Sequence, residues 1–209
     1  MSGTGDTVFI VDDDNGIRTS IRALMRSIGL DAEPFASAQE FLDYYEPARS
    51  GCLILDIRMP KMDGLELQHE LNRRGSVLPV IFITGHADVQ MAVAAMRHGA
   101  FDFIEKPFRD QSLIDCVQHA LIRDREARQA AQQTEEARQR IASLTSRERQ
   151  VLQLIASGKP NKAMAQHLGL SRRTVEVHRS HLMRKLAVKS VAELVRIAMD
   201  MNGGQTATH

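Results

Sequence analysis

The stretch Gly51-Cys-Leu-Ile-Leu-Asp56-Ile-Arg-Met-Pro-Lys-Met-Asp-Gly64 decides the fold of this chain. It opens with an apolar run that ends in one carboxylate, Asp56, and such a run predicts a strand buried on both faces. Pro60 and Gly64 then predict a shaped loop before a helix. Ligands of open α/β sheets bind at the carboxyl ends of such strands. Asp56 is therefore the first candidate for a chemical role.

Further apolar runs of strand length alternate with helical patterns on both sides of this stretch. They are Thr7–Val11, Ala32–Phe35, Pro79–Thr84 and Phe101–Ile104. The alternation predicts an α/β fold with a five-stranded parallel sheet and right-handed crossovers, so all strands end at one edge. The residues that this edge would gather are Asp12, Asp13, Asp56, Thr84 and Lys106.

Each of these residues alone also fits a solvated loop or a good strand former. Their occurrence at successive strand ends favours a common site, because the fold must bring them together. Clustered carboxylates repel one another and favour a divalent cation, and oxygen ligands favour Mg²⁺, or Mn²⁺, over zinc. Asp56 would then attack phosphorus, while Lys106 and the Thr84 hydroxyl stabilise charge on the phosphoryl oxygens.

Composition limits the class of protein. The chain has 209 residues, of which 43% are hydrophobic and 25% charged, and no apolar run approaches the roughly 18 residues of a membrane span. The first residues lack the pattern of a signal peptide. Cys52 and Cys116 fit reduced, buried thiols better than a disulfide framework. We therefore expect a soluble protein of the cytoplasm that has no membrane partner.

Charge divides the chain into two parts. Residues 1–144 contain 16 Lys and Arg against 22 Asp and Glu, a net charge of −6, whereas residues 145–209 contain 11 against 4, a net charge of +7. This asymmetry predicts an acidic domain joined to a domain that binds a polyanion.

Residues 123–140 connect the two parts. They contain neither glycine nor proline, are rich in strong helix formers and have no large apolar side chain. The composition predicts a long solvated helix that continues the helix beginning near Arg109. A coiled coil is the alternative, although only alanines could fill its core positions.

Residues 141–202 read as four short helices. The turn Leu168-Gly-Leu-Ser171 joins the second to the third, as in a helix-turn-helix unit whose second helix enters the major groove of DNA. That third helix carries several basic residues. A basic helix is by itself most often a solvated face, but here the turn and the charge asymmetry both favour a nucleic-acid interface.

Residues 6–124 resemble a CheY-like receiver domain, since Asp12-Asp13, Asp56, Thr84 and Lys106-Pro107 occur in the order and spacing of that family. The resemblance implies a flavodoxin-like sheet of order 2-1-3-4-5. It also implies roles for single residues: Asp56 as phosphoacceptor, Asp12, Asp13, Asp56 and the main-chain carbonyl of Arg58 as metal ligands, Thr84, Lys106 and Phe103 as phosphoryl-binding and switch residues, and Arg58 and His86 as residues that tune the lifetime of the acyl phosphate.

The C-terminal part resembles a LuxR-type DNA-binding domain. The motifs are Leu144-Thr-Ser-Arg-Glu148, Asn161-Lys162, Leu170-Ser171 and Thr174-Val175 with His178. The resemblance places Glu176, Val177, Arg179 and Ser180 toward base edges, and Lys162, Arg172, Arg173 and Lys185 on or near phosphates, with Thr174 also in the interface. Glu176 is suited to accept a hydrogen bond from a cytosine amino group.

Both domains together occur in response regulators of the FixJ/NarL type. We therefore expect a receiver (6–122), a helical linker (123–140), a helix-turn-helix domain (141–202) and a disordered tail (203–209). The resemblance implies a sensor histidine kinase, promoter DNA and RNA polymerase as partners, and dimerisation on phosphorylation. It also implies that the protein turns over no external substrate and hydrolyses only its own aspartyl phosphate.

Two alternatives remain open from the sequence. A DNA-binding regulator could use its receiver only to dimerise, but its site residues should then have degenerated. An aspartyl-phosphate phosphatase would also use an Asp nucleophile and Mg²⁺, but its nucleophile strand usually reads Asp-x-Asp, and position 58 is Arg.

Overall fold

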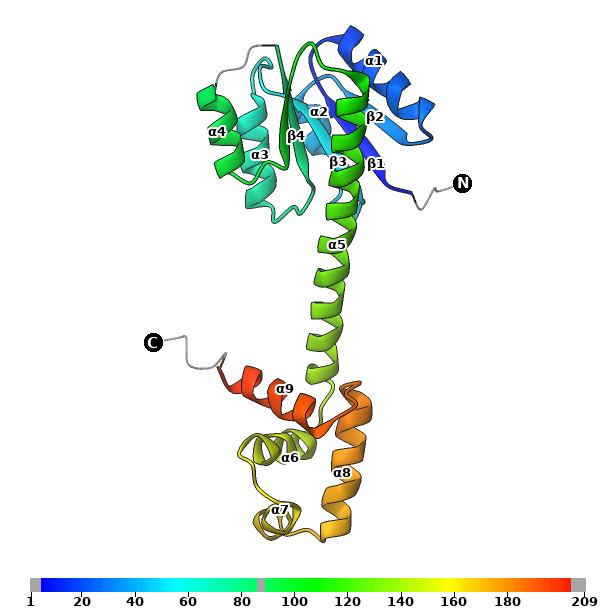
Figure 1. The fold of residues 1–209 in the computed structure, drawn as a ribbon. Helices are drawn as coiled ribbons and strands as arrows, with labels where there is room; N and C mark the ends of the chain where they lie inside the picture. The colour runs from blue at the N-terminus through cyan, green and yellow to red at the C-terminus, as the bar shows by residue number, and fades with distance from the viewer. Residues whose placement is uncertain (1–4, 86–88, 204–209) are drawn as a thin grey trace. The chain divides into compact units, whose positions relative to one another are not determined.

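The computed structural model describes residues 5–85 and 89–203 of the chain (Figure 1). The chain divides into two compact units within helix α5 (Asp110–Ala142), after Ala130. Two features discussed above lie outside the described residues: His86 and most of the tail, residues 204–209. Across the described ranges, no helix is long and apolar enough to span a bilayer.

The first unit is built on a parallel sheet of five strands in the order β2-β1-β3-β4-β5. The strands are β1 (Thr7–Val11), β2 (Asp31–Phe35), β3 (Gly51–Asp56), β4 (Val80–Thr84) and β5 (Asp102–Glu105). The order and the parallel pairing confirm the predicted flavodoxin-like fold. Pro34 lies in edge strand β2, where its missing N–H interrupts no ladder between strands.

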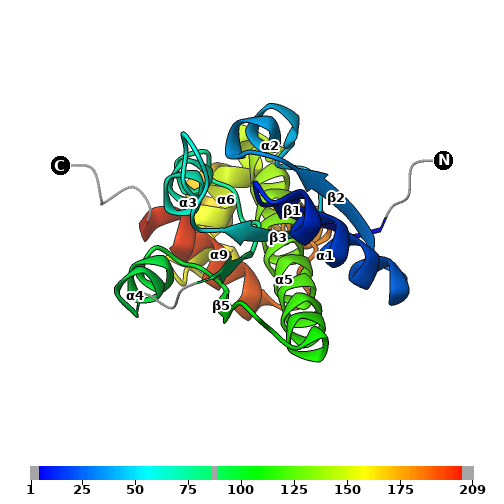
Figure 2. The same cartoon turned by 90° about the horizontal axis from the view of Figure 1, so that it is seen from above.

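Helices cover both faces of this sheet (Figure 2). Helices α1 (Asn15–Ser27) and α5 pack on one face, and α2 (Ala38–Tyr44), α3 (Gly64–Arg73) and α4 (Val89–Arg97) pack on the other. Because successive strand residues point to opposite faces, Val8 and Ile10 join the first core while Phe9 and Val11 join the second. A sheet buried on both faces explains the continuous apolar runs in the sequence.

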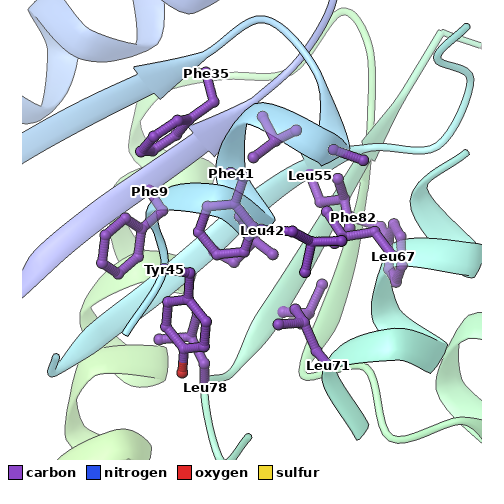
Figure 3. Close-up of a cluster of buried hydrophobic side chains, with 14 of the residues drawn as sticks. Phe9, Phe35, Phe41, Leu42, Tyr45, Leu55, Leu67, Leu71, Leu78 and Phe82 are labelled. Carbon is purple, nitrogen blue, oxygen red and sulfur yellow. The ribbon is translucent and has the colours of Figure 1, made fainter. Parts of the chain in front are cut away.

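An aromatic cluster holds α2 against the sheet (Figure 3). The ring centroid of Phe41 lies 5.6 Å from that of Phe9, 5.4 Å from that of Phe35 and 5.1 Å from that of Tyr45. Burying one such side chain contributes about 1.5–3 kcal/mol. The cluster therefore fixes α2 on β1 and β2, and β1 leads directly into Asp12 of the site described below.

Helix α5 is anchored to the rest of the first unit beyond the last turn that covers the sheet. The Asp124 side chain is fully buried and its Oδ2 accepts from Gly51 N–H (3.0 Å) and from Arg128 Nε (2.7 Å). The same guanidinium donates to the carbonyls of Pro47 (2.8 Å) and Arg49 (2.6 Å). These contacts, the Asp124–Arg128 anchor, connect the linker helix to the first residue of β3.

The next turns of α5 have a different environment. Residues 131–140 are exposed apart from half-buried Glu136, whose carboxylate pairs with Arg140 at 3.1 Å. This exposure agrees with the prediction of a charged, solvated helix.

Beyond the end of α5, the second unit contains α6 (Ser146–Ala156), α7 (Asn161–Leu168), α8 (Arg172–Lys185) and α9 (Val191–Gly203), as predicted. Gly169 ends α7 in the left-handed region, with φ 65°, which a residue without a Cβ adopts readily. The side chain of Ser171 then caps α8 by accepting from Thr174 N–H at 3.1 Å. Val175 and Leu182 are fully buried, so the rows of α8 opposite to them face solvent.

Candidate functional site

Three strand ends converge on one charged cluster in the first unit. Asp12 follows β1, Asp56 ends β3, and Lys106 follows β5. Lys106 Nζ lies 2.8 Å from Asp12 Oδ2 and 2.8 Å from Asp56 Oδ1, although these residues are 94 and 50 positions away in the chain. The parallel sheet thus brings together two carboxylates and one ammonium that are remote in sequence.

The charges and the burial around Asp56 disfavour its ionised form. Burial raises the pKa of the Asp56 carboxyl, the hydrogen bond from Lys106 lowers it, and the neighbouring charge of Asp12 raises it again, with a net increase. Burial disfavours the Lys106 charge, but the hydrogen bonds to Asp12 and Asp56 outweigh burial and raise the lysine pKa. Lys106 is therefore a firmly protonated cation beside an incompletely stabilised carboxylate.

Local backbone contacts orient both carboxylates. Asp56 Oδ2 accepts from the N–H of Arg58 (2.9 Å), and Asp12 Oδ1 accepts from the N–H of Asp14 (2.8 Å). The chain must also return closely to the end of β3: a Cβ at Gly64 would lie 2.4 Å from the Asp56 carbonyl oxygen. Glycine at position 64 therefore permits the loop that carries Arg58 to return to the end of β3.

The other predicted residues surround this cluster. Thr84 is buried at the end of β4, and its carbonyl accepts from the N–H of Lys106 at 2.7 Å. Phe103 is half-buried and packs against the core on the α2–α4 face. Asp13 and Arg58 have exposed side chains.

A divalent cation fits the chemistry of this cluster. Asp12 and Asp56 raise each other's energy by repulsion, and the ammonium of Lys106 between them shows that a positive charge is accommodated there. Among the described residues, however, no three Asp, Glu, His or Cys side chains are grouped as a ready metal site. Asp13, exposed next to Asp12, would have to turn inward to complete the ligand set.

The basic domain presents a polar ridge on α8. Arg173, Glu176, Val177 and Ser180 are exposed, and Val177 is an exposed apolar side chain at 46% of its full area. The spacing of three and four residues places them on one side of the helix, away from buried Val175. Arg172, the first residue of α8, and Lys162, in the first turn of α7, also have exposed side chains.

Two predicted DNA-contacting residues have partners within the domain. Lys185 Nζ donates to Glu148 Oε2 at 2.7 Å, and Arg179 Nη1 donates to Asn161 Oδ1 at 2.5 Å. The hydrogen bond from Lys185, opposed by burial and aided by Thr145, lowers the pKa of Glu148 to about 2.

The sequence pattern alone did not predict these internal contacts. Thr145 and Glu148 form a capping box, whose Thr-x-x-Glu signature was a usable signal. Asp14 was also missed: it caps α1 by accepting from the N–H of Gly16 at 2.6 Å, so the third acid of the run is structural.

Comparison with known proteins agrees with the structure of each of the two units. Residues 8–118 match the family described as "Response regulator receiver domain", and residues 142–198 match "Bacterial regulatory proteins, luxR family". Transcriptional regulatory protein FixJ of Azorhizobium caulinodans is 46% identical over 92% of this chain and 91% of its own. Response regulator protein TodT of Pseudomonas putida is 43% identical over 94% of this chain and 87% of its own. The structure of the response regulator StyR superposes with a TM-score of 0.85 at 45% identity, covering 93% of this chain and 98% of StyR.

A receiver fold with an Asp–Lys cluster, followed by a helix-turn-helix domain, defines a regulator and not a typical enzyme. The chain belongs to the two-component response regulators that join a receiver domain to a LuxR-type DNA-binding domain.

Proposed function

We propose that a sensor histidine kinase phosphorylates Asp56 and that phosphorylation promotes dimerisation through the receiver and sequence-specific binding of promoter DNA, which regulates transcription in the cytoplasm. The observation that carries this proposal is the bridge of Lys106 between Asp12 and Asp56, at 2.8 Å from each carboxylate. It supplies a nucleophile and a fixed cation at one point.

In the transfer step, an Asp56 oxygen attacks the phosphorus of a phosphohistidine. The phosphorus–nitrogen bond breaks, and the imidazole leaves with the bonding electrons and takes up a proton. Lys106 and the Thr84 hydroxyl stabilise the charge on the phosphoryl oxygens, so positioning and electrostatics supply most of the catalysis. Hydrolysis of the aspartyl phosphate ends the signal, at a rate set by Arg58 and His86.

Asp12, Asp13, Asp56 and the main-chain carbonyl of Arg58 would hold a Mg²⁺ or Mn²⁺ ion. When bound, the ion neutralises charge on the phosphoryl oxygens. Asp12, which is 1% exposed, keeps a carboxylate at the site whether or not Asp13 turns inward.

The surface of α4 and β5 is the proposed dimer interface. Val93 and Met96 on α4 are large apolar side chains that are 44% and 49% exposed. A second copy of the same face would cover them, and a two-fold dimer would present two recognition helices to a two-fold DNA site.

The test measures mass in solution and affinity for a DNA duplex at one fixed salt concentration, with and without beryllofluoride and Mg²⁺. The duplex is one enriched by the wild-type chain from a randomised library. The mimic should convert monomer to dimer and tighten binding in the wild type, and do neither in Asp56→Asn. Equally tight dimeric binding by Asp56→Asn would refute phosphorylation-dependent switching and favour a regulator whose receiver only dimerises.

A further inference from the structure

Arg179 lies on a different side of α8 from the exposed ridge. It is four residues after Val175 and three before Leu182, both fully buried, so helical spacing places it beside the core-facing row. Its side chain is half-buried, whereas Glu176, Val177 and Ser180 are exposed. A residue in this row reaches toward α7 and not straight outward from the ridge.

The guanidinium of Arg179 is held at the start of α7. Its Nη1 donates to Oδ1 of Asn161, the first residue of that helix, at 2.5 Å. Lys162, the next residue, has an exposed side chain. Within the described part of the chain, no acidic side chain forms an ion pair with Arg179 or Lys162. Two uncompensated positive charges from two helices are therefore positioned near the first turn of α7.

The partner of Arg179 leaves its charge intact. Lys185 on the same helix is paired with the Glu148 carboxylate at 2.7 Å, which offsets the lysine charge. Asn161 is neutral and occupies one of the five N–H groups of a guanidinium, so the other donors and the full charge remain for a ligand. Holding the side chain in place also reduces the entropy lost when that ligand binds.

We propose that Asn161 is a positioning residue that presents Arg179 to a phosphate of the DNA backbone, and that Arg179 does not read a base edge. This inference rests on the DNA binding proposed above and reassigns Arg179 from the base-contacting set suggested by resemblance. Base reading is left to Glu176, Val177 and Ser180 of the exposed ridge, while Arg173 stays in the phosphate-contacting set.

The experiment uses the full chain, the enriched duplex and a second duplex altered at one base pair in each half-site. Dissociation constants are measured between 50 and 200 mM salt for the wild type, Arg179→Ala, Asn161→Ala, their double variant and Asn161→Asp. Ser180→Ala, from the ridge, is the control variant. Melting curves verify that each variant folds.

Arg179→Ala should weaken binding to both duplexes by the same factor and reduce the salt slope by about 1 per DNA-binding domain. Asn161→Ala should weaken binding about 3- to 10-fold in the wild-type background and have no effect beside Arg179→Ala, as expected for residues that act as one unit. Asn161→Asp should keep the contact yet reduce the salt slope, because its carboxylate offsets the arginine charge. A purely structural role for Asn161 would not change the slope. Ser180→Ala should change the ratio between the duplexes and leave the slope unchanged.

An unchanged salt slope together with poorer discrimination in Arg179→Ala would show that Arg179 reads a base and would overturn the proposal. Additive effects of the two alanine variants would overturn the positioning role of Asn161. Failure of the wild-type chain to enrich any duplex would instead overturn the DNA-binding function itself.

Discussion

The receiver and the DNA-binding domain each contain a lysine bound to a buried carboxylate, with nearly the same geometry and opposite effects. Lys106 lies 2.8 Å from Asp56, and Lys185 lies 2.7 Å from Glu148. The pKa of Asp56 is nevertheless raised, while the pKa of Glu148 is lowered to about 2.

The neighbours of each carboxylate explain the difference. Glu148 has Lys185 as an ionic partner and also accepts from the N–H and hydroxyl of Thr145, at 2.9 and 3.1 Å. Asp56 is penalised by burial, competes with Asp12 for one lysine and is repelled by that acid. A lysine–carboxylate contact is therefore a stabilising brace in one domain and a reactive, destabilised group in the other. Four predictions test this contrast, in order of decreasing effect.

Replacing Lys185 should break the brace. Lys185→Met leaves Glu148, whose side chain is 7% exposed, without its ionic partner. We expect unfolding of the second unit to become easier by about 2–3 kcal/mol, less than for a fully buried pair because 36% of the lysine side chain reaches solvent. Urea unfolding followed by amide NMR signals of residues 145–198 measures the change. Lys189→Met, at an exposed lysine in the loop after α8, should shift stability by no more than about 0.5 kcal/mol.

Acid should remove the same stabilisation. Because the pKa of Glu148 is lowered from 4.5 to about 2 in the folded state, its contribution is present above pH 4.5 and is lost as the pH falls toward 2. The loss should be on the order of 2 kcal/mol in the second unit. In Glu148→Gln, this decrease in the free energy of unfolding between pH 4.5 and 2 should be absent. An equally steep decrease in that variant would assign the effect to other groups.

Neutralising Asp56 should stabilise the receiver, whereas removing the charge of Lys185 or Glu148 should destabilise the second unit. A raised carboxyl pKa means that the charged form destabilises the fold above that pKa, so Asp56→Asn should stabilise the receiver at pH 7, by less than Lys185→Met destabilises the second unit. Both tyrosines of the chain, Tyr44 and Tyr45, lie in the receiver, and their near-ultraviolet dichroism reports its thermal unfolding. Asp13→Asn, at an exposed acid, should change stability less. Destabilisation by Asp56→Asn would mean that the Lys106 contact outweighs burial and repulsion.

The smallest effect is that of a divalent cation. Mg²⁺ at a concentration equal to its dissociation constant should stabilise the wild-type receiver by about 0.4 kcal/mol and the Asp56→Asn receiver by less. The same tyrosine signal, recorded with Mg²⁺ and then after chelation, measures the difference. Equal stabilisation of both chains would place the cation elsewhere.

The sequence predicted what depends on local pattern. Apolar runs that alternate with helical patterns predicted the buried strands and the order of the helices. They also predicted that Asp12, Asp56 and Lys106 lie at one edge of the sheet. Contacts that depend on how the helices pack against loops and other helices did not follow. Asp124 and Arg128 are spaced like Glu136 and Arg140 on the same helix, yet one pair is buried and the other exposed, because only the first meets the chain at Gly51.

Arg179 illustrates the same limit. Its basic side chain on a recognition helix indicated DNA in general, but its row on α8 and its partner Asn161 depend on how α7 packs. Spacing from Val175 was a usable signal that the pattern of charges obscured.

The Asp124–Arg128 anchor determines where this protein can be recombined with others. A receiver cut at residue 122 would lose the buried carboxylate that accepts from Gly51 and the guanidinium that joins the carbonyls of Pro47 and Arg49. A functional hybrid, whether built in the laboratory or produced by gene fusion, must therefore carry its own linker through Arg128. The interchangeable module of this chain is the receiver with the first turns of its connecting helix.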